Sequence, residues 1–177
     1  MSWSLDKQHI ELGFSTKHMM VATVKGRFTD MDAEVHLDER NPEASFVRAT
    51  VVAASLTTGS DDRDNHLKSA DFFNVDQYPA LTFVSREVRR NGDDLELVGD
   101  LTIKDVTRPV VLKGEYTGPV QGPWGGRHLG FSLTGELDRE DFGLTWNVAL
   151  EAGGVLVGRK VKLSIDAEVK EDVVAAA

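Results

Sequence analysis

The sequence predicts an all-β protein whose strands close into an antiparallel barrel. Apolar and polar residues alternate with a period of two, as in Ile10, Leu12 and Phe14 and again from Val161 to Val169. This alternation indicates strands with one buried and one solvated face. Turn-forming pairs such as Asn91-Gly92 separate the alternating runs. Because long strands with one apolar face tend to curl and close, which removes exposed edges, we expect a barrel.

The chain contains about eight strand-like runs, which are, in order, residues 7–15, 24–38, 45–57, 80–90, 94–104, 107–118, 127–139 and 155–169. Asn91-Gly92 lies between the fourth and fifth runs and predicts a tight hairpin. We expect helix in two places, Thr16 to Ala22 and Asp61 to Ala70, and irregular structure over residues 140–154. No repeat or linker divides the sequence, so residues 1–177 are expected to form one domain with a frayed end at 173–177.

Composition excludes several classes of function. The chain has 177 residues, enough for a substantial core, and no cysteine, so disulfides, thiolate nucleophiles and cysteine metal sites are excluded. The formal charge of -9 argues against nucleic acid or an anionic membrane surface as a partner. The apolar runs are too short for an integral membrane span. The first residues show no basic start and no apolar stretch, so we expect no secretory signal and a cytoplasmic location.

A connection of some twenty residues between the third and fourth runs departs from the alternating pattern. A loop of this length in a compact domain is usually functional or disordered, and this one carries many anchoring side chains. We expect Arg63 and Asp64 to hydrogen-bond the loop and cap its short helix, and His66 to tie the helix to a strand. Asp71-Phe72-Phe73 and Tyr78 are interpreted as a plug over one end of the barrel.

The motifs of this connection resemble those of the YceI-like, polyisoprenoid-binding family. Its members carry an Arg-Asp-x-His-Leu run followed by Asp-Phe-Phe and Tyr-Pro-x-x-x-Phe, which stand here at Arg63 to Leu67, Asp71 to Phe73 and Tyr78 to Phe83. The resemblance extends over roughly residues 3 to 169 and includes Arg139 with Asp141-Phe142-Gly143. It implies an extended, lipocalin-like barrel with a short helical loop near one end. Many relatives are exported and relatives often pair, so a homodimer is a further expectation.

The resemblance also implies that the barrel holds an isoprenoid lipid, such as a prenol or the tail of a quinone, for transport, storage or shielding. An eight-stranded barrel is just wide enough either to be filled by its own side chains or to hold one ligand. The inner face mixes large and small residues, a pattern that good packing alone also produces. The side chains expected to contact the lipid are Phe14, Phe28, Val51, Phe72, Phe73, Phe83, Leu97 and Phe131.

Two alternatives to a lipid-binding protein stay open at this point. One is a stress or interaction protein with a filled core and no ligand. The other is an enzyme for a small apolar molecule, with His66 or His18 as acid or base. Nucleophile and phosphate-binding motifs are missing, so we predict no catalytic residue and no cofactor other than a bound lipid. The five histidines stand singly at positions 9, 18, 36, 66 and 128, so we predict no metal site.

Overall fold

The computed structural model describes residues 2–173, which form one ten-stranded antiparallel sheet closed into a barrel. The strands are β1 (Trp3–His18), β2 (Ala22–Phe28), β3 (Met31–His36), β4 (Phe46–Val52), β5 (Leu56–Thr57), β6 (Ala80–Asn91), β7 (Asp94–Ile103), β8 (Val106–Gln121), β9 (Arg127–Asp138) and β10 (Lys160–Glu171). The helix α1 (Asp61–Lys68) is accompanied by the short 3-10 turns η1 (Pro42–Ala44), η2 (Ala53–Ser55) and η3 (Arg139–Phe142).

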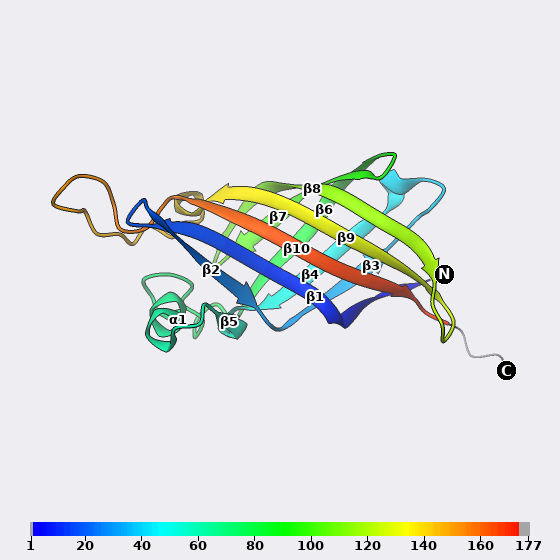
Figure 1. Ribbon diagram of the computed structural model, residues 1–177, viewed down its shortest axis with the longest axis horizontal. Coiled ribbons are helices and arrows are strands. Elements are labelled where there is room, and N and C mark those ends of the chain that lie inside the picture. Colours follow the sequence, from blue (N-terminus) through cyan, green and yellow to red (C-terminus); the bar gives the residue numbers. More distant parts are fainter. Residues whose placement is uncertain (1, 174–177) are drawn as a thin grey trace.

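Eight strands make up the closed ring. They follow the order β10-β9-β8-β7-β6-β4-β3-β1, and β1 then pairs with β10 to complete the circle. The strands β2 and β5 extend the sheet beside β1 at one end. Figure 1 shows an elongated barrel in which α1 and the loop before β10 lie at the same end, while β1 begins at the opposite end. The predicted fold class, an extended antiparallel barrel of about eight strands with a helical loop near one end, is confirmed.

Two of the eight predicted runs are interrupted in the structure. The run 24–38 breaks at Thr29 and Asp30 into β2 and β3, which pair with different parts of β1. The run 45–57 breaks at η2 into β4 and the two-residue strand β5. The last predicted run, 155–169, is partly wrong because β10 begins only at Lys160. Before it, the Gly158 N–H donates to the Lys17 carbonyl and Val157 bridges to His18, in a register shifted from that of β10 on β1. Of the predicted frayed end, residues 174–177 lie outside the described residues.

The helix predicted for Thr16 to Ala22 is wrong. Strand β1 continues to His18, and a tight turn at Met19 and Met20 leads into β2, with the Val21 N–H bonded to the His18 carbonyl. Both turn residues have positive φ, 51° and 63°. The connection contains three residues, Met19 to Val21, because His18 pairs with Ala22. Positive φ at two successive residues is the conformation of the central residues of a type I′ turn, for which Asn-Gly is the usual sequence.

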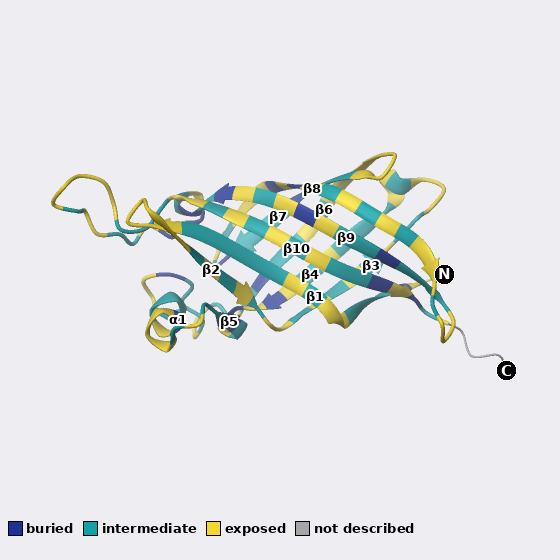
Figure 2. Cartoon of the chain, in the orientation of Figure 1, coloured by how far each residue is buried: buried dark blue, intermediate teal, exposed yellow. Residues whose placement is uncertain are grey.

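The pleat of the strands places apolar side chains inside the barrel. Along β8, β9 and β10, buried or half-buried residues alternate with exposed ones (Figure 2). One buried cluster includes Val51, Leu112 and Leu133, and a second gathers around Trp3, Leu129 and Val169. The described chain has no helix with the length and apolar character needed to cross a membrane.

Candidate ligand cavity

The barrel encloses an apolar cavity of about 480 Å³. This volume lies within the range of small-molecule pockets, roughly 300–1,000 Å³. Side chains from all eight strands of the ring line it, together with residues of the α1 loop and of the loop before β10. The eight side chains expected to contact lipid all lie in this lining: Phe14, Phe28, Val51, Phe72, Phe73, Phe83, Leu97 and Phe131. Their role in binding stays a prediction.

Glycines in the wall leave room for aromatic rings to lie close to the sheet. A Cβ atom added at Gly26 would lie 2.3 Å from the tip of the Phe14 ring, and one added at Gly99 would lie 2.3 Å from the tip of the Phe83 ring. Each ring therefore occupies the space that a side chain at the neighbouring glycine would need. Phe28 packs against both Phe14 and Phe73, with ring centroids 5.5 and 5.8 Å apart. The arrangement leaves open space in the middle of the barrel.

The α1 loop covers one end of the cavity, and hydrogen bonds to Thr58 fix its start. The Asp64 carboxylate accepts from the Thr58 backbone N–H at 2.8 Å and from its hydroxyl at 2.6 Å, and Arg63 donates to the Thr58 hydroxyl and carbonyl. Burial alone would raise the pKa of Asp64, but these hydrogen bonds outweigh it and hold that pKa below its usual value. The helix cap itself is Ser60, whose hydroxyl accepts from the Arg63 N–H, and not Arg63 or Asp64 as expected.

His66 contacts other loop residues instead of a strand, which corrects the expected tie. Its Nε2 lies 3.0 Å from the Asp71 carboxylate, and its ring packs edge-on against Phe72 and Trp146. Phe72 is buried and reaches the cavity, whereas neither His66 nor Tyr78 is part of the lining. Trp146 belongs to the loop before β10, so the aromatic cluster of His66, Phe72 and Trp146 joins the two loops that cover this end.

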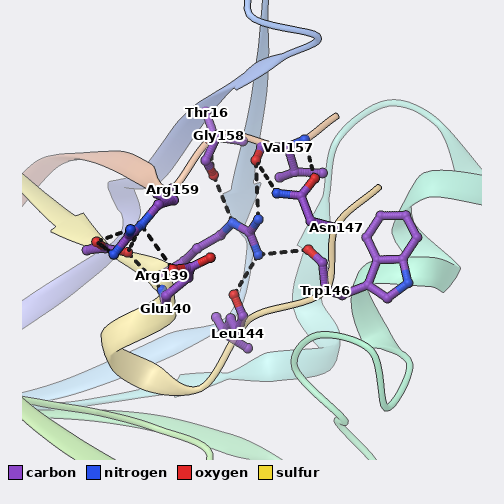
Figure 3. Close-up of polar contacts among 10 residues, drawn as sticks. Thr16, Arg139, Glu140, Leu144, Trp146, Asn147, Val157, Gly158 and Arg159 are labelled. Carbon is purple, nitrogen blue, oxygen red and sulfur yellow. Dashed lines mark hydrogen bonds and ion pairs between the residues drawn. The ribbon is translucent and has the colours of Figure 1, made fainter. Parts of the chain in front are cut away.

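Arg139 anchors the loop before β10, and sequence reasoning gave it no role of its own. It is 3% exposed, and its guanidinium donates to the backbone carbonyls of Gly158, Leu144, Trp146 and Val157. Figure 3 shows these carbonyls converging on the guanidinium from both sides of the loop. Burial lowers the pKa of Arg139 below its usual value. The signal that pointed to this residue was its place in the family motif with Asp141-Phe142-Gly143.

The opposite end of the cavity carries more polar side chains. Asp38, Glu39, Ser45 and Arg90 belong to the lining there, and the Arg90 guanidinium lies 4.5 Å from the centre of the Tyr116 ring. Arg127 donates to the Glu171 carboxylate at 2.8 Å and to Glu39 at 2.7 Å. The hydrogen bond from Arg127 holds the pKa of Glu171 below its usual value. These ion pairs tie the β3–β4 connection to β9 and β10.

A closed antiparallel barrel with an apolar internal cavity, covered at one end by a helical loop, defines a lipocalin-like class of barrel. The chain belongs to the YceI-like family, because the model of the YceI-like domain matches residues 3–169. The resemblance inferred from the sequence motifs is confirmed.

A relative supports this assignment, and two solved structures share the fold. The chain is 37% identical over 171 residues to the UPF0312 protein SERP2314 of Staphylococcus epidermidis, an alignment that covers 96% of this chain and 98% of that protein. The fold is similar to that of BcnA of Burkholderia cenocepacia, with a TM-score of 0.79 and 20% identity over 93% of this chain and 98% of that one. It is also similar to a polyisoprenoid binding domain from Saccharophagus degradans, with a TM-score of 0.68 and 13% identity over 97% and 99% of the two chains.

Proposed function

We propose that the chain binds an isoprenoid lipid of the prenol or quinone type inside its barrel, for transport, storage or shielding and without catalysis. The observation that carries the proposal is the apolar cavity of about 480 Å³, lined by residues of every strand of the ring. The name of the Saccharophagus degradans domain, a polyisoprenoid binding domain of similar fold, supports the choice of ligand class. The barrel would remove the apolar chain of the lipid from water while the outer face stays solvated.

The energy of burial is sufficient for this role. Each buried CH₂ group contributes about 0.8 kcal/mol, so a five-carbon unit contributes roughly 3 kcal/mol before ordering costs. A few units therefore reach micromolar affinity, about -8 kcal/mol, after the cost of association. Because branched hydrocarbon offers no hydrogen bonds, selectivity would depend mainly on the length of the cavity.

The position of the histidines favours binding over the enzyme alternative. Neither His66 nor His18 belongs to the cavity lining among residues 2–173. His66 is occupied by Asp71, Phe72 and Trp146, and His18 ends strand β1 beside the exposed turn at Met19 and Met20. A substrate in the barrel would therefore have neither imidazole in the wall around it. A cytoplasmic location and a homodimer belong to the same proposal; the location rests on the sequence, and the homodimer rests on the resemblance to a family whose members often pair.

Native mass spectrometry of the purified chain, followed by organic extraction, tests the proposal. A co-purifying species with the mass and fragments of a prenyl chain supports it. A barrel without ligand, together with no rise in melting temperature on adding quinones or prenols, would favour the filled-core alternative over lipid binding.

A matched pair of variants on β4 sharpens the experiment. Val51→Trp places a large side chain into the cavity, whereas Val52→Trp places it on the exposed side of the same strand. We expect the first variant to lose bound lipid and the second to retain it. Equal lipid content in two folded variants would contradict binding in the cavity.

A further inference from the structure

The seam that closes the barrel contains a bulge. Leu5 of β1 pairs with Val169 of β10, and Ile10 pairs with Ala167, so the four residues 6–9 lie opposite Glu168 alone. Bulges interrupt pairing and redirect side chains, and they are found more often than expected next to functional sites. This bulge lies on the outer surface and brings Asp6 and His9 close to Glu168.

The side chains of Asp6, His9 and Glu168 bring atoms that can bind a metal close together at this seam. The Asp6 carboxylate lies 3.0 Å from His9 Nδ1, and one ligand atom each of Asp6, His9 and Glu168 lie within 4.8 Å of one another. The second oxygen of Asp6 accepts the backbone N–H of Gln8 at 3.0 Å, which fixes the carboxylate within the bulge. The group is therefore assembled by the backbone of β1 and β10.

A second histidine orients Glu168. This residue is His128 of the neighbouring strand β9, and its Nδ1 lies 2.6 Å from Glu168 Oε1. A histidine that donates to one oxygen of a carboxylate holds it in place and leaves the other oxygen free to bind a cation. Such supporting hydrogen bonds are a regular feature of metal sites.

The charge around this group favours a cation. A shallow depression on the surface is lined by His9 and Glu168 together with the carboxylates of Glu115 and Asp166, and no Lys or Arg belongs to its lining in the described part of the chain. The charge of Lys170, which also acts on Asp6, opposes this preference only in part.

We propose that Asp6, His9 and Glu168 form a binding site for a first-row divalent transition-metal ion, with His128 as a positioning residue. One imidazole and two carboxylates are ligands that suit Zn²⁺ and its neighbours better than a site of oxygen atoms alone. Nitrogen and oxygen ligands about 2.0–2.1 Å from a tetrahedral zinc ion lie roughly 3.3 Å apart. The 3.0 Å contact between His9 and Asp6 needs only a small opening to accept the ion. A bound ion would link the bulge of β1 to β10 at the closing seam.

Isothermal titration of the metal-stripped, untagged chain with ZnCl₂ tests the site. We expect one Zn²⁺ per chain, weaker binding of Ca²⁺, and a melting temperature that rises with Zn²⁺ concentration because the ion binds the folded state. His9→Ala should lose the Zn²⁺ heat and the melting shift. Since the His9 side chain is mostly exposed, this variant should keep the melting temperature of the metal-free wild type.

Two further variants separate ligation from positioning. His128→Gln should weaken Zn²⁺ binding by about 10–100-fold, the usual effect of removing a supporting hydrogen bond. His18→Ala is the matched control, because His18 is an exposed histidine of the same strand outside the group, and it should bind as the wild type does. No zinc-dependent heat in the wild type, or undiminished binding by folded His9→Ala, would overturn the proposal.

Discussion

Replacing Arg139 by methionine tests whether this residue anchors the loop that covers the cavity. Methionine keeps much of the apolar length of the side chain but removes the guanidinium donors. The carbonyls of Leu144, Trp146, Val157 and Gly158 then lose their donor from Arg139. The perturbation is therefore directed at the loop before β10 and leaves the barrel strands untouched.

The magnitude follows from the burial of these carbonyls. An unsatisfied buried acceptor costs about 1–3 kcal/mol. Leu144 is buried and carries the full penalty, whereas Trp146, Val157 and Gly158 are half-buried and can recruit water. Removal of the guanidinium also removes its own desolvation cost, the cause of its lowered pKa. We expect a net loss of about 3 kcal/mol, a large part of the roughly 5–15 kcal/mol that stabilises a typical domain.

Urea unfolding of the two proteins measures this loss as a lower midpoint with an unchanged slope. Arg159→Met is the matched control, because Arg159 is the next arginine in the same region but forms exposed ion pairs with Asp138 and Glu140. Exposed ion pairs contribute little, so the control should unfold close to the wild-type midpoint. A loss below about 1 kcal/mol for Arg139→Met, equal to that of the control, would refute the anchoring role.

Three further predictions concern the cavity wall, the loop that covers it and one ion pair outside it. Gly26→Ala should turn the Phe14 ring into the lumen, because the three atoms nearest to the new methyl group all belong to that ring, and bound lipid measured by extraction should fall in a protein that still folds. Phe72→Ala should lower the free energy of unfolding by about 3–5 kcal/mol through the cavity it leaves, whereas the fully exposed Trp124 should tolerate alanine without measurable change in the same urea experiment. The hydrogen bond from Arg159 lowers the pKa of Asp138, so the folded state binds this proton less readily than the unfolded chain. The ionised Asp138 stabilises the fold fully at pH values above the pKa of an unfolded aspartate, about 3.9, and this contribution is lost as the pH falls through the lowered pKa of the folded state. The melting temperature of Asp138→Asn should therefore fall less steeply on acidification than that of the wild type.

The eight strands of the closed ring could be predicted from the sequence because the pleat imposes a period of two wherever one face is buried. The break between β2 and β3 also left a signal. The inward positions are Val24, Gly26 and Phe28 before the break and Met31, Ala33 and Val35 after it, so they change from even to odd numbers. A shift of one residue reverses every side chain, and a single strand cannot contain it without a bulge or break.

The hairpin at Met19 and Met20 could not be predicted in the same way. Methionine is a good helix former and carries no preference for positive φ, so the local sequence favours helix over a tight turn. Pairing of β1 with β2 and β10 overrides that preference, as tertiary contacts often do. Local propensity was therefore the wrong guide at a position where long-range pairing decides.

The group of Asp6, His9 and Glu168 was hidden for a different reason. His9 and Glu168 lie at opposite ends of the sequence, and their proximity depends on how β1 closes onto β10. The spacing of these residues along the sequence predicts neither the register of β1 on β10 nor the bulge in it. The cavity-lining residues were accessible to prediction because each is placed by alternation within its own strand or by the family motif, so their inward direction did not require the register of closure.

Strand number alone does not decide whether the interior of such a barrel is filled or open, since eight strands allow both. The distribution of side-chain volume decides it. Phe14 beside Gly26 and Phe83 beside Gly99 place large rings over positions without side chains, so the rings occupy space at the wall. Had these glycines carried side chains, the same rings would have to cross the lumen. The small residues of the inner face therefore make room for the rings and leave the lumen open, and a lumen lined mainly by apolar side chains is suited to a chain-like hydrocarbon.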